Sequence, residues 1–209
     1  MESGKGPLPI LGVNPLVIVG AQVDGKPDFA TLAWTGVACS APPCISIALQ
    51  PHRHSLKGIR QNMAFSINIP STDMVKETDY CGIVSGAVED KVKDCHFTLF
   101  YGENRNAPFI GECPVNHACA VIQILNLGSH VLVVGRIVET HVSSDCLTQG
   151  RPDTAKIKPL LTAGMNYYGI DARNLGVAFQ VGKTIKPGAQ LNPPRPLRET
   201  PQRPPGSMP

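Results

Sequence analysis

Aromatic and charged residues are both scarce in this chain of 209 residues. Aromatic side chains make up 5% of it and charged side chains 17%, whereas 42% of the residues are hydrophobic. These proportions exclude a disordered chain and a coiled coil, and they are typical of one folded globular domain. The 20 glycines and 20 prolines favour a β architecture with many turns.

The motifs of several common function classes are missing as well. There is no GxGxxG after a strand, no GxxxxGK[ST] and no GxSxG, which argues against the usual nucleotide-binding folds and a serine hydrolase. No run approaches the ~20 apolar residues of a membrane span, so we expect no membrane partner. The segment PLPILGVNPLVIVGA is interrupted by Gly12, Asn14 and Pro15, which disfavours a secretory signal peptide.

The net charge of +3 comes from the C-terminal end of the chain. Residues 1–185 hold 15 basic and 15 acidic residues, while residues 186–209 hold 4 and 1. Nucleic-acid recognition needs a clustered basic face, which a body without net charge does not favour. We therefore expect no nucleic-acid partner.

The cysteine pattern indicates free thiols. Seven is an odd number, and the sequence has no CxxC pair or repeated framework. Reduced thiols in a cytoplasmic protein are the simpler interpretation. Cys113, His117 and Cys119 are close in sequence, but five residues separate the two cysteines, which is not the C-x₂₋₄-C spacing of structural zinc. We expect no metal.

Apolar, β-branched runs bounded by Gly, Pro and Asn recur along the chain and predict strands. The clearest are residues 16–23, 29–39, 45–49, 64–69, 118–127 and 130–142. The pair Asp24-Gly25 is typical of a tight hairpin turn between the first two. Short helices are expected over residues 56–62 and 72–80. About nine short strands with few helices predict a β-barrel.

We expect residues 1–185 to form one domain. Its last pieces are KPLLTAGMNYYGI, interpreted as a loop with aromatics, and NLGVAFQVG, interpreted as a closing strand. The 23 residues from Pro187 onward include 8 prolines and cannot form a packed core. We therefore predict an extended or disordered tail over residues 186–209.

One stretch of small residues is a candidate ligand surface. FATLAWTGVACSAPPCISIALQ, residues 29–50, is nearly free of charge and contains the only tryptophan, Trp34. Small side chains let a planar ligand approach the main chain, whose amides can bind its polar edge. Pro42 and Pro43 rigidify the end of the strand. The alternative is that these small residues merely fill a tight barrel.

Two further segments are candidate anion sites. In PHRHSLKGIRQN, Arg53, His54 and Ser55 stand where a helix begins, so backbone amides, a hydroxyl and positive side chains converge. An ordinary helix cap would have the same sequence. In DYCGIVSGAVEDKVKD, Ser85 and Lys91 lie near another helix start, and a lysine can neutralise a phosphate as a point charge. A solvated surface lysine is the alternative.

Taken in order, five stretches resemble the flavin reductase-like family, whose members have an FMN-binding split barrel, and among them the flavoredoxin-type members most. The stretches are NPLVIVGAQVDGKPDFATLAWTGVACSAPPCISIAL, RHSLKGIRQNMAFSINIPS, VKETDYCGIVSGAVEDKV, APFIGECPV and LGSHVLVVGRIVETHV. The resemblance implies a mainly β fold, a six-stranded antiparallel split β-barrel of Greek-key type with a few short helices. It also implies a homodimer with FMN near the subunit interface.

The resemblance further implies which residues contact FMN. Those lining the flavin, largely through main chain, are Thr31, Trp34, Thr35, Cys39 and Ser40. Those beside the phosphate and ribityl groups are Arg53, His54 and Ser55, which match an R-x-T pattern with Ser in place of Thr. Asn68 matches a position that faces the cofactor, Ser85 and Lys91 match the SGRDVDKF phosphate segment, and Tyr167 or Tyr168 lies where an aromatic often covers the flavin.

The sequence departs from the family pattern at two places. SGAVEDKV lacks the Arg after SG, which leaves Lys91 a larger share of the phosphate charge, and Val92 replaces the usual aromatic. GSH replaces the frequent GDH, so the acid is absent while His130 remains.

The implied activity is oxidoreduction. FMN would accept hydride from NADH or NADPH and pass electrons to free flavin, ferric iron or another acceptor, without a side-chain acid or base. An alternative is an electron carrier that acts with a redox protein partner and has little nicotinamide activity. A third possibility is a split barrel that binds haem or another flat ligand.

Overall fold

A computed structural model describes residues 8, 9 and 11–170. From Gly12 on, these residues belong to one compact unit. The predicted closing strand within residues 174–182 and the predicted tail over 186–209 lie outside the described residues.

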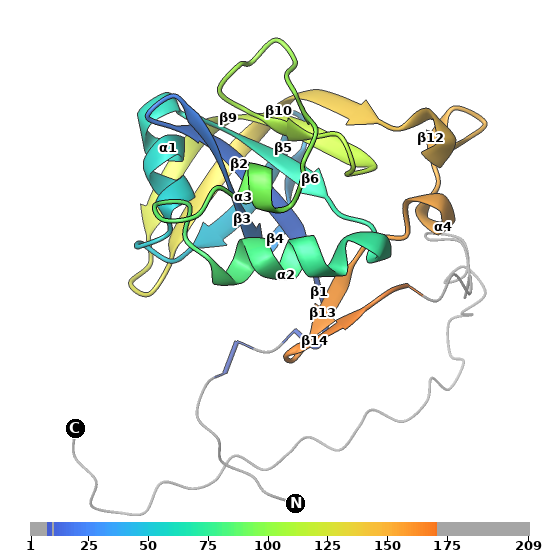
Figure 1. Cartoon of the computed structure of the whole chain (residues 1–209), viewed down its shortest axis with the longest axis horizontal. Coiled ribbons are helices and arrows are strands. Elements are labelled where there is room, and N and C mark those ends of the chain that lie inside the picture. Colours follow the sequence, from blue (N-terminus) through green and yellow to red (C-terminus); the bar gives the residue numbers. More distant parts are fainter. Residues whose placement is uncertain (1–7, 10, 171–209) are drawn as a thin grey trace, which may run out of the picture. The chain divides into compact units, whose positions relative to one another are not determined.

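Seven antiparallel strands form the main sheet, in the order β3-β2-β6-β9-β10-β5-β4 (Figure 1). Their bounds are β2 Val17–Val23, β3 Lys26–Leu32, β4 Thr35–Ser40, β5 Pro43–Leu49, β6 Ala64–Ile69, β9 Val115–Asn126 and β10 Val131–Val142. The mainly β class with few helices is confirmed, but the sheet has seven strands where six were predicted.

The additional strand arises because the run predicted as one strand over residues 29–39 is broken at Ala33 and Trp34. β3 and β4 consequently stand at opposite ends of the strand order. Their ends, Leu32 and Thr35, are three Cα steps apart, so they lie within about 11 Å of each other. The two edges of the sheet must therefore approach each other, and the sheet curls like a barrel that remains split between β3 and β4.

The hairpins follow from local chemistry. Asp24 and Gly25 join β2 to β3 with φ of 52° and 78°, the left-handed backbone that a tight two-residue turn requires and that Asp and Gly tolerate. β9 and β10 form the longest hairpin, in which Asn126 pairs with Val131. Each strand is buried in its first half, and Cys119 of β9 and Val131 and Val133 of β10 belong to the main core.

Helix α1, His54–Asn62, packs against β2. Its side chains Leu56 and Ile59 enter the main hydrophobic core. Gly58 allows the close approach, because a Cβ at this position would lie 2.3 Å from the carbonyl oxygen of Gln22. Met63 ends the helix in the left-handed conformation, φ 49°.

A second layer covers β3. The 3₁₀ turn η1, Thr72–Met74, leads into α2, Val75–Ile83, and the short α3, Lys91–Asp94, follows. Figure 1 shows α2 lying across this part of the sheet. Beneath these helices lies a second core cluster, which comprises Ile18, Phe29, Met74, Cys81, Phe97, Ile110 and Cys113.

The remaining elements are short. They are β1 Asn14–Pro15, β7 Leu99–Phe100, β8 Phe109–Ile110, η2 Ser144–Cys146, β11 Leu147–Thr148, β12 Arg151–Pro152, α4 Thr154–Ile157, β13 Leu161–Ala163 and β14 Asn166–Tyr168. β13 and β14 pair with each other, and β13 pairs with β1. The segment over residues 158–170, predicted as a loop, is therefore a small hairpin, which Gly164 turns at φ 61°.

All seven cysteines carry free thiols. Cys113 belongs to the cluster beneath α2 and Cys119 to the main core, so the two residues that are close in sequence are buried in different places. Among the described residues, no helix has the length and apolar character needed to cross a membrane.

Candidate functional site at the end of α2

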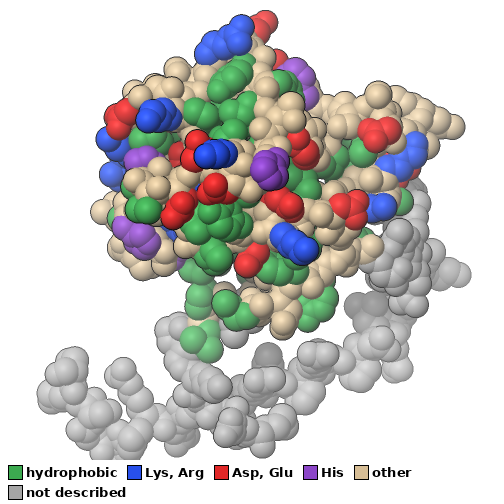
Figure 2. Space-filling model, in the orientation of Figure 1, with side chains coloured by type: hydrophobic (Ala, Val, Ile, Leu, Met, Phe, Trp, Pro, Cys, Tyr) green, Lys and Arg blue, Asp and Glu red, His purple; other side chains and the backbone are tan. Residues whose placement is uncertain are grey.

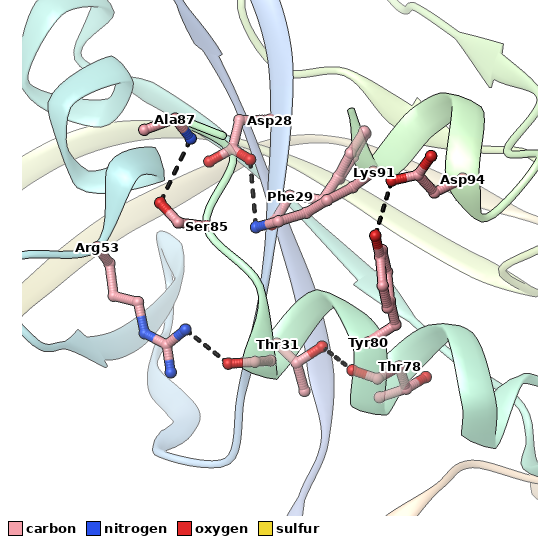
Figure 3. Close-up of polar contacts among 11 residues, drawn as sticks. Asp28, Phe29, Thr31, Arg53, Thr78, Tyr80, Ser85, Ala87, Lys91 and Asp94 are labelled. Carbon is pink, nitrogen blue, oxygen red and sulfur yellow. Dashed lines mark hydrogen bonds and ion pairs between the residues drawn. The ribbon is translucent and has the colours of Figure 1, made fainter. Parts of the chain in front are cut away.

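Thr31 is held against helix α2. Its hydroxyl donates a hydrogen bond of 2.5 Å to the carbonyl oxygen of Thr78 (Figure 3). One turn further along the helix, Gly82 packs beside it, since a Cβ there would lie 3.5 Å from the Thr31 Cβ. The half-buried Thr31 therefore marks where β3 meets the C-terminal end of α2.

Arg53 reaches the same place from the start of α1. Its Nη1 donates a hydrogen bond of 2.6 Å to the carbonyl oxygen of Gly82 (Figure 3). The last carbonyls of a helix lack intrahelical partners and carry partial negative charge, so a guanidinium stabilises them. One of the Arg53 nitrogens is thus fixed, and the orientation of the guanidinium is set before any ligand binds.

Ser85 follows the end of α2 by two residues and organises the next turn. Its hydroxyl oxygen accepts a hydrogen bond of 3.3 Å from the amide of Ala87. Its carbonyl oxygen accepts hydrogen bonds of 3.0 Å from the amides of Val88 and Glu89. Three backbone donors of the predicted phosphate segment are therefore used within the turn, and the exposed Ser85 hydroxyl keeps its own proton to donate.

Lys91 is buried, which differs from both sequence interpretations, the phosphate ligand and the solvated surface lysine. The residue is only 4% exposed. Its Nζ lies 3.3 Å from Oδ1 of the buried Asp28 and also donates to the carbonyl oxygen of Phe29 (Figure 3). Asp28 therefore neutralises the positive charge of Lys91, which the sequence analysis expected to neutralise a phosphate. A cavity of about 460 Å³ adjoins this pair.

Asn68 also has the contacts of a core residue. Its side chain is 0% exposed, and its Nδ2 donates to the carbonyl oxygen of Ile18 at 2.8 Å and to the Ser66 hydroxyl at 3.0 Å. Its Oδ1 accepts a hydrogen bond of 3.0 Å from the amide of Ile110. The amide joins β2 to β8 inside the protein. The expectation that Asn68 faces a cofactor is corrected, because its polar atoms are directed to the backbone of the core.

Trp34 lies between the two edges of the sheet and is 44% exposed. Its ring packs on that of His130, with centroids 4.2 Å apart and an interplanar angle of 32°. The Trp34 carbonyl oxygen accepts a 2.9 Å hydrogen bond from the amide of Ala48. Stacking on His130 therefore orients the indole, the hydrogen bond fixes the Trp34 backbone, and the ring still presents area to a ligand.

β4 provides an open edge next to Trp34. Thr35 is tied to the neighbouring β5, since its hydroxyl donates to the carbonyl oxygen of Ser46 at 2.9 Å. Residues 37–40 of the strand are exposed, including Cys39 and Ser40. β4 is the last strand in the order, so one row of its backbone groups has no strand partner among the described residues. The small residues 38–40 therefore do not fill the interior of a barrel, whereas Ala30 and Cys44 in the same stretch are buried.

Tyr167 reaches α2 from the C-terminal hairpin. Its hydroxyl donates a hydrogen bond to the carboxylate of Asp79. Burial, followed by this hydrogen bond, raises the pKa of Tyr167 to about 12. At 37% exposed, the ring remains accessible, and its partner Asp79 follows Thr78, the partner of Thr31, on α2.

Eight of the predicted site residues form two groups. Thr31, Arg53, Ser85 and Tyr167 meet on α2 or at its C-terminal end, and Trp34, Thr35, Cys39 and Ser40 lie on the adjoining edge of the sheet. His54 is half-buried and lines a cavity with Arg53, whereas Ser55 is 1% exposed.

Sequence reasoning missed three participants. They are Asp28, which holds Lys91, the Gly82 carbonyl, which holds Arg53, and the packing of His130 on Trp34. An acidic residue within an apolar strand was the signal for Asp28, because a buried carboxylate needs a partner. No local signal identifies a backbone carbonyl or a stacking partner that is distant in sequence.

A mainly β sheet that curls and stays open between β3 and β4, with few helices, defines the chain as a split-barrel protein. The model of the flavin reductase-like domain matches residues 13–171, and the chain belongs to this family.

Solved structures of flavoredoxins are similar over nearly their whole length. The flavoredoxin of Methanosarcina acetivorans is 34% identical with a TM-score of 0.82, and the match covers 88% of this chain and 98% of that one. The flavoredoxin of Desulfovibrio vulgaris (Miyazaki F) is 33% identical with a TM-score of 0.80, covering 87% and 100%. An FMN-binding protein of Thermus thermophilus, 21% identical with a TM-score of 0.72 over 85% and 99%, shares the fold.

Proposed function

We propose that the protein binds FMN at the end of α2 and along the edge strand β4, and that it acts as a flavin-dependent oxidoreductase. The observation that carries this proposal is the convergence of Thr31, Arg53 and Ser85 at one helix end beside the exposed edge strand. The flavoredoxin-like fold and the FMN-binding neighbour from Thermus support the same cofactor.

The residues present fit the chemical groups of FMN. A phosphate requires positive charge and donors, which the Arg53 guanidinium and the Ser85 hydroxyl supply. A flat ring requires an apolar surface, which Trp34 supplies, and its polar edge requires backbone donors, which an unpaired strand edge supplies. Lys91 contributes less than predicted, because Asp28 already neutralises its charge.

FMN, when bound, supplies the redox chemistry of such a site. The chain's own part is to orient the ring, through Trp34 and β4, and to place donors where negative charge develops. No side chain of the two groups needs to act as a general acid or base. We propose NADH or NADPH as the hydride donor and free flavin, ferric iron or another small acceptor as the destination of the electrons.

The similarity to flavoredoxins favours one second candidate. The protein would then be an electron carrier that exchanges electrons with a redox protein partner and oxidises nicotinamide slowly. Both functions need the same cofactor site, so the residues of the site do not distinguish them.

We also propose that two copies of the chain associate. Large apolar side chains are exposed on the outer parts of three strands of the sheet, which are Val37 on β4, Ile122 and Leu125 on β9 and Val138 on β10. Large apolar side chains exposed on the same sheet support an interaction surface. Measurement of the molar mass in solution tests this, and a monomer at micromolar concentration would contradict it.

Anaerobic stopped-flow mixing of the FMN-loaded protein with each nicotinamide distinguishes the two functions. Rapid loss of the oxidised-flavin absorption supports the enzyme. Absence of reduction by millimolar nicotinamide, together with reduction by a ferredoxin-type donor, supports the carrier. A purified protein without flavin absorption and without affinity for FMN would overturn both.

A further inference from the structure

A second basic site adjoins the proposed flavin site. A cavity of about 500 Å³ opens over the first turns of α1, and its polar lining comprises His52, Arg53, His54, Lys57, Arg60 and Gln61. This volume falls within the ~300–1,000 Å³ of small-molecule pockets. Figure 2 shows basic and histidine side chains together on the side of the molecule where α1 lies in Figure 1.

The charges around this cavity do not cancel. The acidic group that contacts its lining is Asp24, whose carboxylate lies 2.6 Å from the Lys57 Nζ and accepts a 2.9 Å hydrogen bond from Gln61. These two hydrogen bonds lower the pKa of Asp24, which therefore stays ionised. Because Arg53 is proposed to hold the FMN phosphate, Lys57 and Arg60 against Asp24 leave a net charge of +1 from the lysine, arginine and aspartate side chains of this cavity.

Donors remain unused in this cavity. Arg53 contributes Nη1 to the Gly82 carbonyl, and the guanidinium has further N–H groups. The Arg60 side chain forms no hydrogen bond or ion pair with any residue in the described part of the chain. Planar guanidinium groups with free donors match phosphate oxygens. The ligand class that fits is therefore an anion with phosphate groups.

We propose that this cavity binds phosphate groups of the nicotinamide dinucleotide that reduces the flavin. The inference rests on the proposed function, and it identifies where the hydride donor is held. Because Arg53 belongs to both sites, a dinucleotide whose nicotinamide ring lies at the flavin would extend its phosphates toward α1. The groups that fit are the pyrophosphate, which NADH and NADPH share, and the 2′-phosphate, which NADPH alone carries.

The test uses the FMN-loaded protein and three variants. Arg60→Ala and Lys57→Ala each remove one positive charge from the cavity. Lys76→Ala, on α2 and outside the cavity, is the control for loss of one charge. Calorimetric titration with ADP and with adenosine 2′,5′-bisphosphate measures binding without turnover, and stopped-flow reduction by NADH and NADPH measures the same contact in the reaction.

We expect Arg60→Ala to weaken binding about tenfold, the range of a hydrogen bond to a charged group, and increasing salt to weaken wild-type binding. Equal losses with ADP and the 2′,5′-bisphosphate assign the cavity to the pyrophosphate. A loss confined to the 2′,5′-bisphosphate and NADPH assigns it to the 2′-phosphate. Either result supports the proposal.

Three results would overturn it. The first is that neither nucleotide binds to the wild-type protein. The second is that Arg60→Ala and Lys57→Ala have nucleotide affinities within twofold of that of Lys76→Ala. The third is that these variants lose FMN affinity in place of nucleotide affinity, which would make the cavity part of the flavin site. Failure of the proposed function has a different signature, since the flavin would then be absent, or would stay oxidised with both nicotinamides while the nucleotides still bound.

Discussion

Replacement of Asp28 by asparagine tests the buried pair beneath the proposed site. The side chains of Asp28 and Lys91 are only 5% and 3% exposed, and the closest oxygen and nitrogen are 3.3 Å apart. Asn has nearly the same shape as Asp, which matters because Gly86 packs tightly on this carboxylate and a Cβ at Gly86 would lie 1.9 Å from Oδ1. The substitution thus removes charge with little change in volume.

The expected loss is about 3–5 kcal/mol of unfolding free energy, the cost of leaving one partner of a buried pair uncompensated. Urea unfolding of the apo protein, followed by far-UV circular dichroism, measures it. The matched control is the double variant Asp28→Asn with Lys91→Met, in which no charge is buried and most of the stability returns. A loss below about 1 kcal/mol in the single variant, or no recovery in the double one, would refute the assignment of a buried, mutually compensating pair.

The other predictions concern packing, pH and the flavin. Gly58→Ala should lower the unfolding free energy by about 1–3 kcal/mol by overpacking, although alanine favours a helix, because the new Cβ would lie 2.3 Å from the Gln22 carbonyl; an unchanged melting temperature would contradict this. Burial lowers the pKa of His117 below its ordinary 6.5, so the unfolded chain takes up the proton first and stability is lost as the pH falls through and below 6.5. His117→Gln should flatten that loss between about pH 7 and 5, and parallel stability curves would disprove it. FMN should quench the fluorescence of Trp34, the only tryptophan and 44% exposed; emission unchanged at saturating FMN would place the ring elsewhere.

Much of the fold followed from periodicity and turn chemistry. The strand over residues 64–69 was predicted with the bounds that β6 has. The Asp24-Gly25 turn and the long β9–β10 hairpin were also predicted. These features depend on neighbouring residues, so the sequence contains their cause.

The break at Ala33 and Trp34 could not be predicted in the same way. Residues 29–39 form one apolar run, and only the pairing of β4 with β5 shows that the chain leaves one edge of the sheet and joins the other. The hairpin of β13 and β14 likewise depends on pairing with β1, which is far away in the sequence.

Which residues hold FMN stays a prediction, and the two residues that the structure places differently, Lys91 and Asn68, share one cause. Residue types identify a group that can bind phosphate, but not whether another residue already occupies it. Lys91 is held by Asp28, and Asn68 is held by the backbone of β2 and β8. Arg53 and Ser85 remain accessible, because their contacts leave donors unused.

The central claim is that this chain binds FMN and that a nicotinamide reduces it. Anaerobic stopped-flow absorption of the FMN-loaded protein, mixed separately with NADH and NADPH, tests it most directly. We predict that the oxidised-flavin band disappears in a phase whose rate saturates with nicotinamide concentration. A flavin band that persists at millimolar concentrations of both nucleotides would contradict it.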